Sequence, residues 1–106
     1  VLGIAFKANS DDIRDSPAVK LVSILKSTGA DLKIHDPFVK NTDDVEVALE
    51  SAELVIIATN HNNFKNYIDM INKANPSLIY DVWGMFQKMI FQIVNILNLE
   101  KILIKF

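Results

Sequence analysis

Two basic side chains stand close to an expected helix start near the beginning of the chain. Lys7 follows the apolar run at residues 1–6, and Arg14, the only arginine, comes just before Ser16 and Pro17. Serine is a favoured N-cap, and proline is favoured at the first helical position. Cations and free backbone N–H groups at a helix N-terminus bind anions together, and arginine matches phosphate in bidentate geometry. The pattern therefore indicates a seat for a phosphorylated ligand, against the alternative that Lys7 and Arg14 are solvated surface charges.

The acidic residues between these two cations have a less specific meaning. Asp11, Asp12 and Asp15 lie in the loop before the helix, where carboxylates usually cap backbone amides or pair with a neighbouring cation such as Arg14. No second cluster of oxygen ligands completes a coordination sphere. We therefore expect no metal site.

Four further side chains follow apolar runs and are candidate site residues. His61 has no carboxylate or nucleophile partner that spacing identifies, so we expect it to form hydrogen bonds within its loop. His35 is interpreted as a structural strand end. Asp81 is expected to cap backbone amides, and Trp83 either packs in the core or stacks on a ligand. No serine–histidine–acid or cysteine–histidine arrangement can be assembled, so no catalytic residue is assigned.

Composition excludes several classes of function. The 106 residues are enough for one domain, and 50% of them are hydrophobic. The net charge of -2 argues against nucleic-acid or membrane-surface binding, and no apolar run is long enough to span a bilayer. The absence of cysteine excludes disulfides and suits the cytoplasm. With three glycines, neither a Gly-x-Gly-x-x-Gly loop nor a Walker loop can be written.

The elements that must position these residues alternate along the chain. Apolar, strand-like runs are separated by segments with helical periodicity, which predicts a Rossmann-like α/β domain. We expect residues 1–106 to form a single three-layer αβα domain, in which helices cover both faces of a parallel sheet of about five strands. Because the chain begins with Val1 inside a strand-like run, we expect it to be part of a longer protein. Strands are expected at 1–6, 32–35, 54–58, 78–82 and 102–106, and helices at 17–28, 45–52, 64–74 and 86–97.

Two strand orders are compatible with this pattern, and they place the ligand crevice differently. A Rossmann-like order would line the crevice with residues 6–10 and 82–85, whereas a flavodoxin-like order would move it towards residues 59–64. Ligands bind at the carboxyl ends of the strands in both orders. The opening segment therefore contributes to the site in either case.

The opening segment also carries a resemblance to a known family. Residues 3–18, Gly-Ile-Ala-Phe-Lys-Ala-Asn-Ser-Asp-Asp-Ile-Arg-Asp-Ser-Pro-Ala, closely resemble the start of the C-terminal, UDP-binding domain of the UDP-glucose/GDP-mannose dehydrogenase family. That family shows Gly-x-Ala-Phe-Lys and Asp-x-Arg-Glu-Ser-Pro there. The resemblance extends to Asp36-Pro37, to Thr59-x-His61-x-x-Phe64 and to Asp81-x-x-Gly84.

The resemblance implies a role in the oxidation of a nucleotide sugar. Such enzymes convert the C6 alcohol of the sugar to a carboxylate, using two NAD and a catalytic cysteine. The resemblance implies that Phe6 and Lys7 contact the UDP-sugar and that Arg14 reaches the NAD phosphates. Trp83 stands where many members have an arginine or lysine that helps to hold the substrate. The chain departs from the family pattern there, and a substrate contact at this position would require stacking on the aromatic ring.

The resemblance also implies which functions other parts of such an enzyme supply. The dinucleotide loop and the cysteine belong to preceding parts, so we expect an N-terminal NAD-binding domain as partner, homo-oligomers of the parent enzyme, and no activity from this segment alone. The motif Thr59-x-His61-x-x-Phe64 is more similar to UDP-N-acetylmannosamine dehydrogenases than to UDP-glucose dehydrogenases.

Two alternative interpretations assign the chain to other classes of function. One is a flavodoxin-like receiver, which would need an aspartate where Thr59 and Asn60 follow the third strand. The other is a stand-alone nucleotide-binding or interaction module without catalysis.

Overall fold

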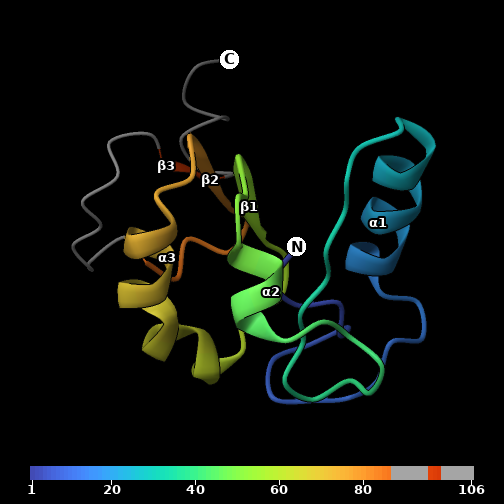
Figure 1. Ribbon diagram of the computed structural model, residues 1–106. Coiled ribbons are helices and arrows are strands. Elements are labelled where there is room, and N and C mark those ends of the chain that lie inside the picture. The colour runs from blue at the N-terminus through green and yellow to red at the C-terminus, as the bar shows by residue number, and fades with distance from the viewer. Residues whose placement is uncertain (87–95, 99–106) are drawn as a thin grey trace.

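A parallel sheet forms the centre of the molecule. The computed structural model describes residues 1–86 and 96–98. The strands are β1 (Leu54–Ile57), β2 (Leu78–Asp81) and β3 (Ile96–Asn98), in the order β1-β2-β3 (Figure 1). Both pairings are parallel, as the alternation of strands and helices predicts. The α/β class is therefore confirmed.

The N-terminal segment adds a further position beside β1 and determines the strand order. Leu2 forms parallel bridges to His35 on one side and to Ile57 of β1 on the other. The order across the molecule is therefore His35, Leu2, β1, β2, β3, which is the flavodoxin-like alternative. Its switch point lies between the ends of the first segment and β1.

The predicted count of five strands is not confirmed. The expected strands at 1–6 and 32–35 each reduce to isolated bridges, while the one at 102–106 lies outside the described residues. The physical reason lies at the end of the first segment. The N–H groups of Ile4 and Ala5 donate to the Asp36 carboxylate instead of to a neighbouring strand.

Three of the four expected helices are found near their predicted positions. They are α1 (Pro17–Ser27), α2 (Val45–Leu49) and α3 (Ile68–Ala74), the last preceded by the 3₁₀ helix η1 (Asn62–Tyr67). Asn75, in the left-handed conformation, ends α3 before Pro76, as the Asn-Pro pair predicts. The fourth helix was expected to continue to Leu97, which instead belongs to β3 and pairs with Tyr80. Residues 87–95 lie outside the described part.

Ser16 precedes α1 as predicted but does not cap it with its side chain. Its buried hydroxyl donates to the carbonyl oxygen of Ile4 at 2.7 Å. This oxygen lies two residues beyond Leu2, where the bridges of the first segment are formed. The helix start is therefore tied to the strand end by a side chain that the sequence assigned to the helix alone.

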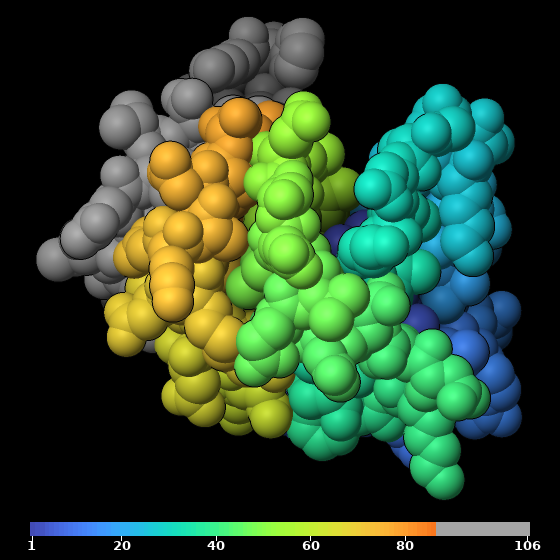
Figure 2. Space-filling model, in the orientation of Figure 1, coloured from blue at the N-terminus to red at the C-terminus, as the bar shows by residue number. Residues whose placement is uncertain are grey.

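The core lies on the side of the sheet covered by α2 and α3. These two helices contact each other, whereas α1 lies apart on the other side of the N-terminal segment (Figure 1). The space-filling view shows a groove between the blue to turquoise part of the chain, which contains α1, and the green part, which contains α2 and β1 (Figure 2). The buried core cluster consists of Leu2, Val45, Leu49, Val55, Ile57, Phe64, Ile71, Ile79 and Phe86.

Candidate functional site

The loop between the first segment and α1 stands at the carboxyl edge of the sheet. Phe6 is 50% exposed, and Lys7 is also exposed. The backbone N–H of Phe6 donates to the carbonyl oxygen of Asp12 at 2.7 Å, which closes residues 6–12 into a compact loop. The loop therefore presents an aromatic ring and a cation to solvent from a closed frame.

Arg14 is exposed and paired within the same loop. Its Nε and Nη2 donate to the two carboxylate oxygens of Asp12 at 3.0 and 2.8 Å. These bonds lower the pKa of Asp12 from 3.8 to about 2. A guanidinium has five N–H donors, and this bidentate pair uses two of them. Arg14 therefore keeps donors for a phosphate, and the pairing orients its planar group.

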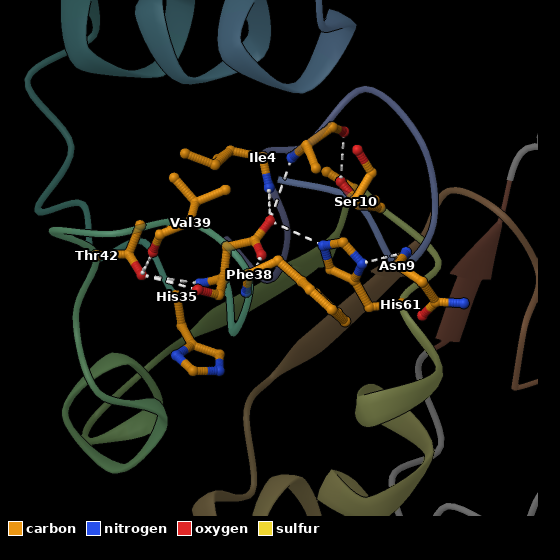
Figure 3. Close-up of polar contacts among 12 residues, drawn as sticks. Ile4, Asn9, Ser10, His35, Phe38, Val39, Thr42 and His61 are labelled. Atoms are coloured by element: carbon orange, nitrogen blue, oxygen red, sulfur yellow. Dashed lines mark hydrogen bonds and ion pairs between the residues drawn. The ribbon is translucent and has the colours of Figure 1, made fainter. Parts of the chain in front are cut away.

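Asp36 is the centre of a buried hydrogen-bond network. Figure 3 shows its partners Ile4, Phe38 and His61, which come together from separate segments of the chain. One oxygen, Oδ2, accepts the N–H groups of Ile4 and Ala5 at 2.8 and 3.2 Å and the Nε2–H of His61 at 2.9 Å. The other, Oδ1, accepts the N–H of Phe38 at 2.9 Å. Four donors thus compensate a carboxylate whose side chain is fully buried, which is the condition for keeping a charge out of water.

His61 connects this network to the loop. Its Nδ1 accepts the backbone N–H of Asn9 at 2.8 Å, so the ring proton resides on Nε2 and is donated to Asp36. The ring is completely buried between Phe38 and Phe64, with centroid distances of 4.7 and 5.3 Å. The expectation that His61 forms loop hydrogen bonds is confirmed, and its carboxylate partner is now identified.

Asn9 makes a second connection to the loop that follows β1. Its Oδ1 accepts the backbone N–H of Asn62 at 3.1 Å, while its own N–H bonds His61. The residue has a φ of 59°, a left-handed conformation that asparagine tolerates better than most residues. The Lys7 loop and the loop after β1 are therefore held together by two bonds at one residue.

The strand ends pack so closely that glycine is required at position 3. Gly3 has a φ of 92°, and a Cβ there would lie 2.6 Å from Cβ of Thr59. Thr59 is fully buried, and its hydroxyl donates to the carbonyl oxygen of Ala5 at 2.9 Å. Gly3 therefore belongs to the frame of the loop.

Trp83 and Asp81 occupy the same edge, one strand further along the sheet. Trp83 is 53% exposed, and its indole N–H donates to the carbonyl oxygen of Ala58 at 3.0 Å. Asp81 is buried and accepts the N–H groups of Met85 and Phe86, so its predicted capping role is confirmed. Trp83 thus presents a fixed aromatic face at the sheet edge that also carries Phe6 and Lys7.

The sequence interpretation did not assign Asp36 to the site, although Asp36-Pro37 is one of the motifs that carry the family resemblance. Asp36 and His61 lie 25 residues apart, so spacing along the chain does not relate them. They meet because each follows a segment that pairs with the first one at Leu2. His35, the expected structural strand end, is confirmed as such: its Nδ1 donates to the Asp43 carbonyl, and its Nε2 accepts the hydroxyl of Tyr67.

The described part of the chain has one further feature, a cavity, outside this loop. No cluster of three metal-ligating side chains occurs in residues 1–86 and 96–98. In that same part of the chain, no helix has the length and apolar character needed to cross a bilayer. A cavity of about 310 Å³ lies between α2 and α3, at the helix ends that lead into the amino ends of β1 and β2. It is therefore at the sheet edge opposite to the loop.

Comparisons with known proteins agree on one family. Residues 1–88 match the model of the UDP-glucose/GDP-mannose dehydrogenase family, UDP binding domain. The UDP-N-acetyl-D-mannosamine dehydrogenase of Pyrococcus horikoshii is 42% identical over 67 residues, which cover 62% of this chain and 16% of that protein. The same enzyme from Methanocaldococcus jannaschii is 31% identical, with 94% of this chain and 23% of that protein covered.

Solved structures give the same result. The UDP-D-ManNAc dehydrogenase from Pyrococcus horikoshii superposes with a TM-score of 0.78 at 30% identity, covering 92% of this chain and 24% of that one. The UDP-N-acetyl-mannosamine dehydrogenase Cap5O from S. aureus gives a TM-score of 0.69 with the same coverage. The chain therefore spans about a quarter, or less, of the length of these relatives. It belongs to the UDP-binding domain of the UDP-glucose/GDP-mannose dehydrogenase family.

Proposed function

We propose that this chain is the nucleotide-sugar-binding part of an NAD-dependent UDP-sugar 6-dehydrogenase, which oxidises the sugar C6 alcohol to a carboxylate. The observation that carries the proposal is the family match over residues 1–88, which includes the whole Lys7 loop and its buried support. Relatives named as UDP-N-acetyl-D-mannosamine dehydrogenases favour that substrate. A relative from Rickettsia typhi named UDP-glucose 6-dehydrogenase is 31% identical over 94% of this chain, so the family match alone does not select the sugar.

Lys7 is the residue proposed to bind the diphosphate. Its side chain is exposed at the sheet edge in a loop that is closed by a backbone bond. An ammonium is a compact charge with three donors, suited to phosphate oxygens. Phe6 and Trp83 are proposed to contact the rest of the nucleotide sugar with their exposed rings, which lie along the same edge.

Arg14 is proposed to contact the NAD phosphates. The guanidinium fits this role because it is 86% exposed and holds Asp12 through only two of its donors. NAD would supply the hydride acceptor, and most of its binding is assigned to an N-terminal domain of the parent protein. We further propose that the parent enzyme is a cytoplasmic homo-oligomer and that this chain alone does not catalyse the reaction.

Titration calorimetry with UDP tests the binding proposal. A charge-assisted hydrogen bond contributes about 1.5–3 kcal/mol, so K7A should weaken UDP binding by about ten- to a hundredfold. K26A is the matched control, because Lys26 is also exposed but lies in the last turn of α1. Equal affinities of a folded K7A variant and the wild-type chain would exclude this role for Lys7.

Thermal unfolding separates the proposal from an interaction module without ligand. A ligand that binds only the folded state raises the melting temperature progressively with concentration. UDP should therefore raise it by an amount that grows with its concentration. No shift at millimolar UDP would favour the interaction module.

A further inference from the structure

We propose that His61 is a positioning residue of the nucleotide site, which holds the Lys7 loop in its binding shape through the Asn9 backbone. The inference rests on the proposed function and extends it to a buried side chain that cannot touch the ligand itself. His61 is 0% exposed, while Lys7 and Phe6 in the loop are exposed. Its effect on a ligand must therefore act through the loop.

The histidine is suited to this task because its two nitrogens have opposite roles. Nε2 donates to the Asp36 carboxylate at 2.9 Å, which fixes the tautomer and the ring orientation. Nδ1 is then obliged to be an acceptor, and it receives the Asn9 N–H at 2.8 Å. Phe38 and Phe64 contact the ring, which restricts its rotation. The acceptor is therefore presented to the loop in one fixed direction.

The loop depends on this acceptor because most of its other hydrogen bonds join loop residues to one another. The Phe6 N–H donates a hydrogen bond to the Asp12 carbonyl, and the Asp12 N–H donates one to the Ser10 hydroxyl, so both bonds lie within the loop itself. Between them, Asn9 is attached to the body of the protein by the bonds to His61 and Asn62. Loss of the His61 acceptor would leave the middle of the loop with one hydrogen bond to the rest of the protein. The ligand would then have to order the loop on binding, which lowers the affinity.

Two substitutions separate the two nitrogens. In H61Q, the amide N–H reaches the position of Nε2 and can donate to Asp36, but no acceptor remains for Asn9. In H61N, the amide oxygen lies near the position of Nδ1 and can accept the Asn9 N–H, but nothing reaches Asp36. H35Q is the control, because His35 is also buried and hydrogen-bonded yet bonds Tyr67 and the Asp43 carbonyl through its ring.

The experiment measures the UDP dissociation constant by calorimetry and the exchange rate of the Asn9 amide by NMR without ligand, using the 106-residue chain. H61Q should bind UDP about three- to tenfold more weakly and exchange the Asn9 amide at least about tenfold faster. H61N should restore both values to near those of the wild-type chain, even though it unfolds at a lower temperature. H35Q should lower only the unfolding temperature.

Three outcomes would contradict these expectations. Unchanged UDP affinity in H61Q with faster Asn9 exchange would overturn the inference while leaving the proposed function intact, and so would equal losses of affinity in H61N and H61Q. Absence of UDP binding by the wild-type chain would overturn the proposed function and this inference together. If H61Q does not fold, the wild-type chain itself keeps the inference testable through the Asn9 amide. That amide should exchange at least about tenfold more slowly than an amide without a hydrogen bond, and an unprotected Asn9 amide would show that His61 does not hold the loop.

Discussion

Replacement of Asp36 by asparagine should remove a large part of the stability of this fold. The carboxylate accepts four hydrogen bonds, and an amide offers only one acceptor oxygen. In the better orientation that oxygen keeps Ile4, Ala5 and His61, while the NH₂ group faces the N–H of Phe38. One charge-assisted bond of about 1.5–3 kcal/mol is lost, and the three others become neutral bonds that are weaker by about 1 kcal/mol each.

The expected total for D36N is a loss of about 3–5 kcal/mol in the free energy of unfolding, since such contributions are not fully additive. Domains of this size have about 5–15 kcal/mol in all, so the variant should be folded marginally. Its melting temperature should fall by more than about 10 °C. Urea unfolding followed by circular dichroism measures the free energy, and the Asn9 amide exchange reports whether the loop above is released.

D43N is the matched control for this substitution. The Asp43 carboxylate is partly buried and accepts one backbone N–H, that of Ile34 at 2.8 Å, which an amide oxygen can also accept. D43N should therefore cost less than about 1 kcal/mol. If D36N destabilises the chain no more than D43N does, the four bonds of Asp36 do not act as the central support that the structure indicates.

Two further substitutions test the frame and the surface of the site. G3A should destabilise the chain by more than about 3 kcal/mol, because a left-handed backbone and a clash with Thr59 act together. G29A is its control and should cost only about 1 kcal/mol in urea unfolding, because Gly29 has a φ of 79° but nothing lies within 4 Å of the added Cβ. Equal losses in the free energy of unfolding would exclude the clash. The Asp12 carboxyl should titrate with a pKa of about 2 in a carbon-detected NMR experiment, and R14A should return it towards 3.8. Because this folded-state pKa is lowered, its stabilising effect should be present above pH 3.8 and disappear as the pH falls through 2; an unchanged pKa in R14A would show that the bidentate pair does not form in solution.

Local sequence signals were sufficient for most elements of the fold. Pro17 after Ser16 placed the start of α1, and Asn75-Pro76 placed the end of α3. The apolar runs at β1 and β2 predicted parallel strands, which the structure confirms. These signals succeed because backbone propensity and hydrophobic periodicity act over a few neighbouring residues.

The same signals failed where long-range partners decide the conformation. The run that ends at Leu97 has helical spacing, yet Ile96–Asn98 pairs with the open edge of β2. Residues 4 and 5 were expected to continue a strand, but their N–H groups have a better acceptor in the Asp36 carboxylate. In each case a partner from another part of the chain outweighs the local preference.

The sequence by itself determined that Lys7 and Arg14 belong to a loop between an apolar segment and a helix, and its motifs indicated the family. Only the tertiary structure showed how that loop is supported. The bridges of Leu2 to both His35 and Ile57 bring Asp36 and His61 beneath the loop, although each pairing joins residues far apart in the chain. Strand order is a property of the assembled sheet, and for this reason the buried histidine and carboxylate could not be paired from spacing.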